Sequence, residues 1–129
     1  MKIGIADSQG MVRYSLRVLL EQQPDWIVCG EAEDRDALFD LVNHDTPDIL
    51  LLDWELPDLM PEVTLCQLRA QFSGLKIVIM SGRPEQKKHI LQAGADGIAS
   101  KAESPEKLLA VLRDLEMDKR LSQEPSSGS

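Results

Sequence analysis

Ile49-Leu50-Leu51-Leu52-Asp53 is a run of four large apolar residues that ends on a carboxylate. Turn-forming residues bound it, with Pro47-Asp48 before it and Leu56-Pro57-Asp58 after it. A short apolar run between such boundaries predicts a strand that is buried on both faces, as in a parallel sheet covered by helices. Ligands of open parallel sheets gather beyond the carboxyl ends of the strands. We therefore consider Asp53 a candidate functional residue, although a lone aspartate at a strand end more often caps a loop or a helix.

The rest of the chain alternates between strand-like and helix-like segments. The other expected strands are 2–6, 26–30, 75–80 and 97–100, and the expected helices are 11–22, one capped by Asp34, 62–72, 84–93 and one that begins at 105. This alternation is typical of an α/β protein with a parallel sheet. We expect one three-layer, doubly wound domain with five parallel strands in the order 2-1-3-4-5.

Capping residues mark several of the helix ends. Asp34 and Ser104 are typical N-cap residues, and Pro105 suits the first helical turn, where its missing N–H is not needed. Gly74 and Gly94 stand where the C-terminus of a helix favours glycine. These signals predict helix boundaries independently of the apolar pattern.

The composition limits the classes of function. Among 129 residues, 14 Lys and Arg stand against 22 Asp and Glu, and the net charge is −8. Clustered basic residues supply most of the affinity for nucleic acids. Because this acidic chain has no dense basic stretch, we do not expect it to bind DNA itself. No apolar stretch reaches the roughly 20 residues of a membrane span and no signal-peptide pattern is present, which predicts a cytoplasmic protein. Cys29, Cys66, His44 and His89 are isolated in the sequence, so we expect free thiols and no metal site built on these residues.

Polar residues stand at the ends of four predicted strands, namely Asp7, Asp53, Ser81 and Lys101. In the expected order the first and third strands are neighbours, so Asp7 and Asp53 would stand side by side, about 4.8 Å apart. Two adjacent carboxylates favour a hard cation with oxygen ligands, and Mg²⁺ suits them better than Zn²⁺. With the Ser81 hydroxyl and the Lys101 ammonium, the group is suited to phosphoryl transfer onto Asp53. Simpler interpretations are helix caps for Asp7 and Ser81 and a solvated surface position for Lys101.

Four stretches give the chain a resemblance to a known family. They are Ile5-Ala6-Asp7, Pro47 to Asp53 with Leu56-Pro57 after it, Met80-Ser81-Gly82, and Gly94-Ala95-Asp96-Gly97 leading to Lys101. In this order and spacing they resemble the receiver domain of two-component response regulators, which has a flavodoxin-like fold, over Lys2 to Leu115. The segments Cys29-Gly30-Glu31-Ala32 and Lys101 to Leu108 are similar to receivers whose output is a LuxR-type helix-turn-helix domain.

This resemblance implies a signalling switch and not an enzyme with a separate substrate. A sensor histidine kinase would phosphorylate Asp53, and only the transfer to this residue and the later hydrolysis would be self-catalysed. Asp7, Asp53 and the backbone carbonyl of Glu55 would hold Mg²⁺. Ser81 and Lys101 would contact the phosphoryl group. The implied output is transcription regulation through a DNA-binding domain outside this chain. The resemblance also implies that the protein could form a homodimer.

Three positions depart from the family pattern. Ser8 replaces the second of two consecutive acids, so it would bind Mg²⁺ only weakly or through a water. Ile98 stands where the family usually has an aromatic ring that turns inward during switching. Pro61 replaces a glycine and is expected to stiffen the loop beside the acceptor. Trp54, directly after the acceptor, is either a docking contact or filler under that loop.

The last residues change in character. From Glu116 on, the sequence passes through MDKR to SQEPSSGS without apolar periodicity, which predicts a flexible linker. We therefore divide the chain into a receiver domain over 1–117 and a linker or tail over 118–129. The closing Ser-Ser-Gly-Ser is either native linker or a remnant of the expression vector.

Other functions stay open beside the phosphorylated switch. Without an acid at position 8, the domain could be a phosphorylation-independent module for protein interaction or dimerisation. A metal-dependent phosphohydrolase ranks below both, because the haloacid-dehalogenase type needs an Asp-x-Asp nucleophile, whereas Ser8 and Gln9 follow Asp7. A flavodoxin ranks below as well, because no phosphate loop rich in Ser, Thr and Gly follows Ala6.

Overall fold

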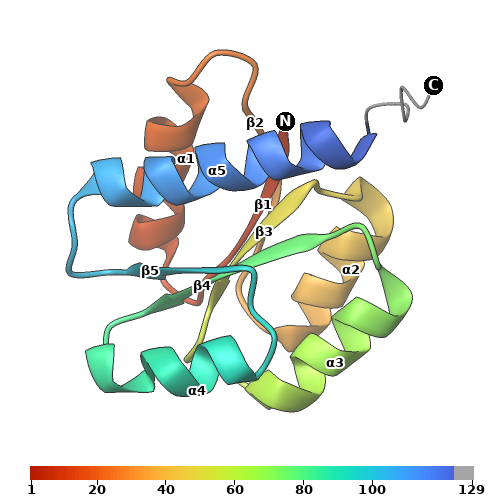
Figure 1. Cartoon of the computed structure of the whole chain (residues 1–129). Helices are drawn as coiled ribbons and strands as arrows, with labels where there is room; N and C mark the ends of the chain where they lie inside the picture. Colours follow the sequence, from red (N-terminus) through yellow and green to blue (C-terminus); the bar gives the residue numbers. More distant parts are fainter. Residues whose placement is uncertain (124–129) are drawn as a thin grey trace.

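The computed structural model describes residues 1–123 and contains five parallel strands that alternate with helices (Figure 1). The strands are β1 (Lys2–Ala6), β2 (Ile27–Ala32), β3 (Ile49–Asp53), β4 (Lys76–Ser81) and β5 (Gly97–Ser100). The helices are α1 (Gly10–Glu21), α2 (Arg35–Asp45), α3 (Pro61–Gln71), the short 3₁₀ helix η1 (Pro84–Gln86), α4 (Lys87–Gln92) and α5 (Pro105–Gln123). The sheet order is β2-β1-β3-β4-β5, which confirms the predicted topology.

Helices cover both faces of the sheet. In Figure 1, α1 and α5 lie on one face, and α2, α3 and α4 lie on the other. The side chains of β3 alternate between the two cores: Ile49 and Leu51 pack toward α1 and α5, whereas Leu50 and Leu52 pack toward α2 and α3. All five residues of β3 are buried. The unbroken apolar run therefore exists because both faces of the strand are covered.

The predicted helix ends are confirmed in part. The Asp34 side chain accepts a hydrogen bond from the backbone N–H of Ala37 at 2.9 Å and so caps α2. Gly94 follows α4 with a φ of 103°, in the region that favours glycine. The prediction for Gly74 was wrong, because α3 ends at Gln71 and leaves the helix through Phe72, whose φ is −135°. No left-handed residue is needed at that exit.

The segments around α3 and α4 differ in detail from the predictions. Pro61 does not lie in the loop but occupies the first turn of α3, where its fixed φ suits the helix. The expected helix over 84–93 is divided into η1 and α4. Pro105 begins α5 as predicted.

The last helix is longer than the sequence predicted. α5 continues to Gln123, so residues 118–123 of the expected flexible tail are helical, and 124–129 lie outside the described residues. Contacts with distant parts of the chain explain the extension: Glu116 accepts a hydrogen bond from Trp26 Nε1 at 3.1 Å, and Lys119 donates one to the carbonyl of Gly74 at 2.6 Å. Even with this length, α5 is not a candidate membrane span, nor is any other helix within residues 1–123.

Candidate functional site

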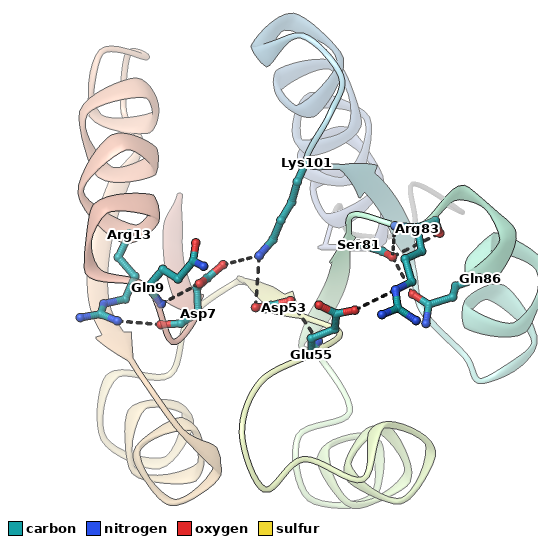
Figure 2. A network of polar contacts seen from close by, with 9 residues as sticks. All are labelled: Asp7, Gln9, Arg13, Asp53, Glu55, Ser81, Arg83, Gln86 and Lys101. Atoms are coloured by element: carbon teal, nitrogen blue, oxygen red, sulfur yellow. Dashed lines mark hydrogen bonds and ion pairs between the residues drawn. The ribbon is translucent and has the colours of Figure 1, made fainter.

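Three polar side chains from three strand ends meet at one edge of the sheet (Figure 2). Asp7 follows β1, Asp53 ends β3 and Lys101 follows β5. The Nζ atom of Lys101 lies 2.8 Å from Oδ2 of Asp7 and 3.1 Å from Oδ2 of Asp53. Asp7 is fully buried and Asp53 is 5% exposed. Parallel strands in the order found here thus bring two carboxylates and an ammonium into direct contact.

Local backbone turns fix the direction of both carboxylates. The backbone N–H of Gln9 donates to Oδ1 of Asp7 at 2.9 Å, and that of Glu55 donates to Oδ1 of Asp53 at 3.0 Å. Each aspartate therefore bonds to the amide two residues further on, as aspartates do in Asx turns. The second oxygen of each carboxylate is left to face Lys101, so the two Oδ2 atoms converge on one positive centre.

Lys101 is held in its charged form. Burial alone would lower the pKa of its ammonium, but hydrogen bonds to Asp7 and Asp53 and the charges of these two carboxylates outweigh burial and raise the pKa. One cation between two anions leaves the group of three with a formal charge of −1. The site therefore retains an attraction for a further cation.

The carboxylates fit a hard metal ion better than a soft one. Their ligand atoms are oxygens only, which suits Mg²⁺. Within residues 1–123, no three or more His, Cys, Asp and Glu side chains form a group able to hold a metal. Any metal here would need a backbone carbonyl and waters beside the two aspartates. Of the other predicted ligands, Ser8 is exposed next to Asp7, and the side chain of Glu55 lies 3.3 Å from Arg83 in an ion pair.

The structure does not bring the Ser81 hydroxyl into this cluster. Ser81 is 5% exposed and ends β4, one residue after Met80, which pairs with Asp53 on β3. Its Oγ lies 2.8 Å from Oε1 of Gln86 and accepts a hydrogen bond from the backbone N–H of Arg83 at 3.0 Å. Figure 2 shows these contacts on the side away from Lys101. This contact agrees better with the simpler interpretation of Ser81 as a helix cap than with a role in the cluster. The amide that Ser81 bonds belongs to Arg83, which directly precedes η1.

Sequence reasoning missed two residues that support the site. Arg13 of α1 donates to the backbone carbonyl of Asp7 at 2.7 Å and to Glu31 at 3.1 Å, and so fixes the turn after β1. Gln86 bonds to Ser81 as described. Neither belongs to a motif, and long polar side chains of this kind are usual on helix surfaces, so no sequence signal marked them.

Trp54 is filler and not a docking contact, because it is only 7% exposed. Its ring meets that of His89 edge-on, with the ring centres 6.1 Å apart and the planes at 82°. His89 in turn bonds to Glu62 of α3. His89 of α4 therefore links Trp54, the residue after Asp53, with Glu62 of α3.

The matching family is the response regulator receiver domain, which covers residues 3–113. The chain therefore belongs to this family and is a receiver domain of a two-component response regulator, a class of signalling switches.

Its relatives include the nitrate/nitrite response regulator protein NarL of Escherichia coli K12, with 33% identity over 110 residues, 84% of this chain and 51% of NarL. Another is the uncharacterised transcriptional regulatory protein YhcZ of Bacillus subtilis, with 32% identity over 111 residues, 84% of this chain and 52% of YhcZ. This chain thus spans about half the length of these curated relatives.

Solved structures show the same architecture. RcsB of Salmonella enterica serovar Typhimurium, bound to the promoter rprA, matches with a TM-score of 0.83 and 26% identity, over 91% of this chain and 60% of RcsB. A LuxR-family response regulator of Aurantimonas matches with a TM-score of 0.81 and 27% identity, over 90% of this chain and 85% of the other. The predicted resemblance and fold are confirmed.

Proposed function

We propose that Asp53 is the phosphoacceptor of this domain and that a sensor histidine kinase supplies the phosphoryl group. One observation carries the proposal: a nearly buried carboxylate at the end of the central strand β3 contacts Lys101 and lies beside Asp7. Membership in the receiver family supports the same role.

The geometry supports a proposed task for each side chain. Because Oδ1 of Asp53 accepts from the Glu55 amide, Oδ2 is the oxygen that we expect to attack phosphorus. An O–P bond then forms while the P–N bond to the kinase histidine breaks, and the leaving imidazole keeps the electron pair and takes a proton. Lys101, 3.1 Å from Oδ2, would neutralise charge on the phosphoryl oxygens. Ser81 would donate to one of these oxygens after its hydroxyl turns away from Gln86.

Asp7, Asp53 and the backbone carbonyl of Glu55 are the groups that would hold Mg²⁺, with Ser8 contributing weakly or through a water. When bound, Mg²⁺ neutralises charge on the phosphoryl oxygens. Asp7 is well placed for this task because the Gln9 amide and Arg13 fix its turn.

The relatives support a proposal for the output. NarL is a response regulator protein, and RcsB was solved on promoter DNA. This chain spans about half of NarL, so we propose that a DNA-binding output domain completes the protein and that phosphorylation in the cytoplasm controls it, directly or through a homodimer.

A second function is favoured by specific observations. Lys101 already bonds to both carboxylates, Ser8 supplies no carboxylate, and the Ser81 hydroxyl bonds elsewhere. A domain in this arrangement could act as an interaction or dimerisation module without being phosphorylated.

Intact-mass measurement separates the two functions. The protein is incubated with acetyl phosphate or the kinase, each with Mg²⁺, and we expect a gain of one phosphoryl group that hydroxylamine removes, as it does from acyl phosphates. Asp53→Asn should gain none, whereas Asp58→Asn, which changes an exposed acid in the next loop, should gain as much as wild type. An unchanged mass with both donors would leave the interaction module as the function.

A further inference from the structure

Ser81, Arg83 and Gln86 form a second polar group at the edge of the sheet. The Ser81 hydroxyl has one proton and two acceptors within reach, Oε1 of Gln86 at 2.8 Å and the carbonyl of Arg83 at 3.3 Å. The shorter contact commits the proton to Gln86. The Arg83 N–H, at 3.0 Å, occupies the accepting side of the same oxygen.

We propose that Gln86 is a positioning residue that holds the Ser81 hydroxyl and competes with a phosphoryl group on Asp53 for its proton. The competition rests on the proposed function of Asp53. Because the hydroxyl has a single proton, Ser81 can donate to a phosphoryl oxygen only after its hydrogen bond to Gln86 breaks. Gln86 therefore biases the domain toward the unphosphorylated arrangement.

The surroundings of Ser81 give it room to make this exchange. A pocket of about 360 Å³ lies beside it, lined by residues of β4, α4, β5 and the loops after the two strands, among them Ser81, Ile90, Ile98 and Ser100. The half-buried side chain of Ile98 carries no polar atom that could bond to the hydroxyl. The polar side-chain partner of Ser81 is thus supplied by η1 and not by β5.

The hydrogen bond also joins two elements. Ser81 is the last residue of β4, and Gln86 is the last residue of η1, directly before α4. Breaking the bond removes one link between the start of α4 and the end of the strand. Phosphorylation of Asp53 would in this way loosen α4, and the exposed face of this helix would carry the change to other parts of the protein.

Matched variants test the role. Gln86→Leu removes the acceptor at similar volume, Gln86→Glu keeps an acceptor oxygen, and Glu85→Gln is a control at an exposed position of η1. In the unphosphorylated protein, NMR reports the χ1 populations of Ser81 and the amide shift of Arg83. We expect Gln86→Leu to change both, and Gln86→Glu and Glu85→Gln to resemble wild type. An unchanged Ser81 in Gln86→Leu would overturn the proposal without reference to Asp53.

Binding of fluoroberyllate with Mg²⁺, a mimic of the phosphoryl group, tests the competition. Gln86→Leu should bind it about fivefold more tightly, the range of one neutral hydrogen bond. In a Ser81→Ala background the same substitution should have no effect, because Gln86 acts through Ser81. An equal gain in both backgrounds would contradict the positioning role. Absence of binding in wild type would instead overturn the phosphoacceptor role and the competition, while the NMR result would still decide whether Gln86 holds Ser81.

Discussion

Oδ2 of Asp7 and Nζ of Lys101 lie 2.8 Å apart although 94 positions separate the residues in the sequence. The carboxylate is fully buried, whereas the lysine side chain is 31% exposed. The ammonium can therefore withdraw toward solvent, and the carboxylate cannot. We therefore expect a metal ion at the two aspartates to displace Lys101.

Lys101→Met should accordingly tighten the binding of Mg²⁺, because the metal no longer competes with the ammonium for Asp7 and Asp53. Titration calorimetry measures the affinity, with Lys88→Met as a control at an exposed position of α4. In metal-free buffer we expect the same variant to lose about 1–2 kcal/mol of unfolding free energy, less than for a fully buried pair because Lys101 is partly exposed. Equal Mg²⁺ affinity in both proteins would show that metal and ammonium do not share the site.

The stability of the wild type should depend on pH through Lys101. Because burial of the ammonium is outweighed by its hydrogen bonds to Asp7 and Asp53, its pKa is raised in the folded state. A raised pKa contributes stability that is complete below the unfolded-state value of about 10.4 and is lost as the pH rises through the folded-state value. From neutral pH upward, the difference in unfolding free energy between wild type and Lys101→Met should therefore be constant to about pH 10 and shrink above it. Chemical denaturation at each pH measures this, and a difference that grows with pH would contradict the assignment.

The two free cysteines should differ in reactivity. Burial raises the pKa of the Cys29 thiol, and Lys2 opposes this only in part, whereas Cys66 is exposed on α3. Since the thiolate is the reactive form, we expect Ellman's reagent to modify Cys66 at least about tenfold faster at neutral pH. The variants Cys66→Ser and Cys29→Ser show which thiol gives the fast phase of the reaction and which gives the slow phase. A fast phase that survives in Cys66→Ser would refute the difference in burial.

Gly97 should not tolerate a side chain. A Cβ atom added there would lie 2.8 Å from Cγ1 of Val111, so the Val111 side chain or α5 would have to shift. We expect Gly97→Ala to lower the unfolding free energy by about 1–3 kcal/mol. Gly74→Ala is the matched control, because nothing lies within 4 Å of a Cβ at that position. Adding Val111→Ala should restore part of the loss, and no rescue would place the strain elsewhere.

Features governed by local pattern could be predicted from the sequence. The bounds of β3 followed from its apolar run, because a strand covered on both faces contains no polar interruption. The proximity of Asp7 and Asp53 followed from strand order, since β1 and β3 are neighbours. Lys101 follows β5, two strands from β3, and its long side chain spans the distance to both carboxylates.

Features governed by distant contacts could not be predicted. The extension of α5 depends on partners such as Trp26, which lies 90 positions before Glu116. The orientation of Ser81 depends on its hydrogen bond to Gln86, and Gln86 belongs to no recognisable sequence motif. Position along the chain located Ser81 at the strand end, but the direction of a hydroxyl is set by its neighbours in space.

The alternation of β3 between two cores has a consequence for signalling. Leu51 and Leu52 are each fully buried, on opposite sides of the strand that carries Asp53. Because close-packed interiors resist displacement, we expect this strand to stay in place on the proposed phosphorylation of Asp53. A shape change would then spread through the more exposed segments after β4 and β5, and we expect partners that detect it to bind there.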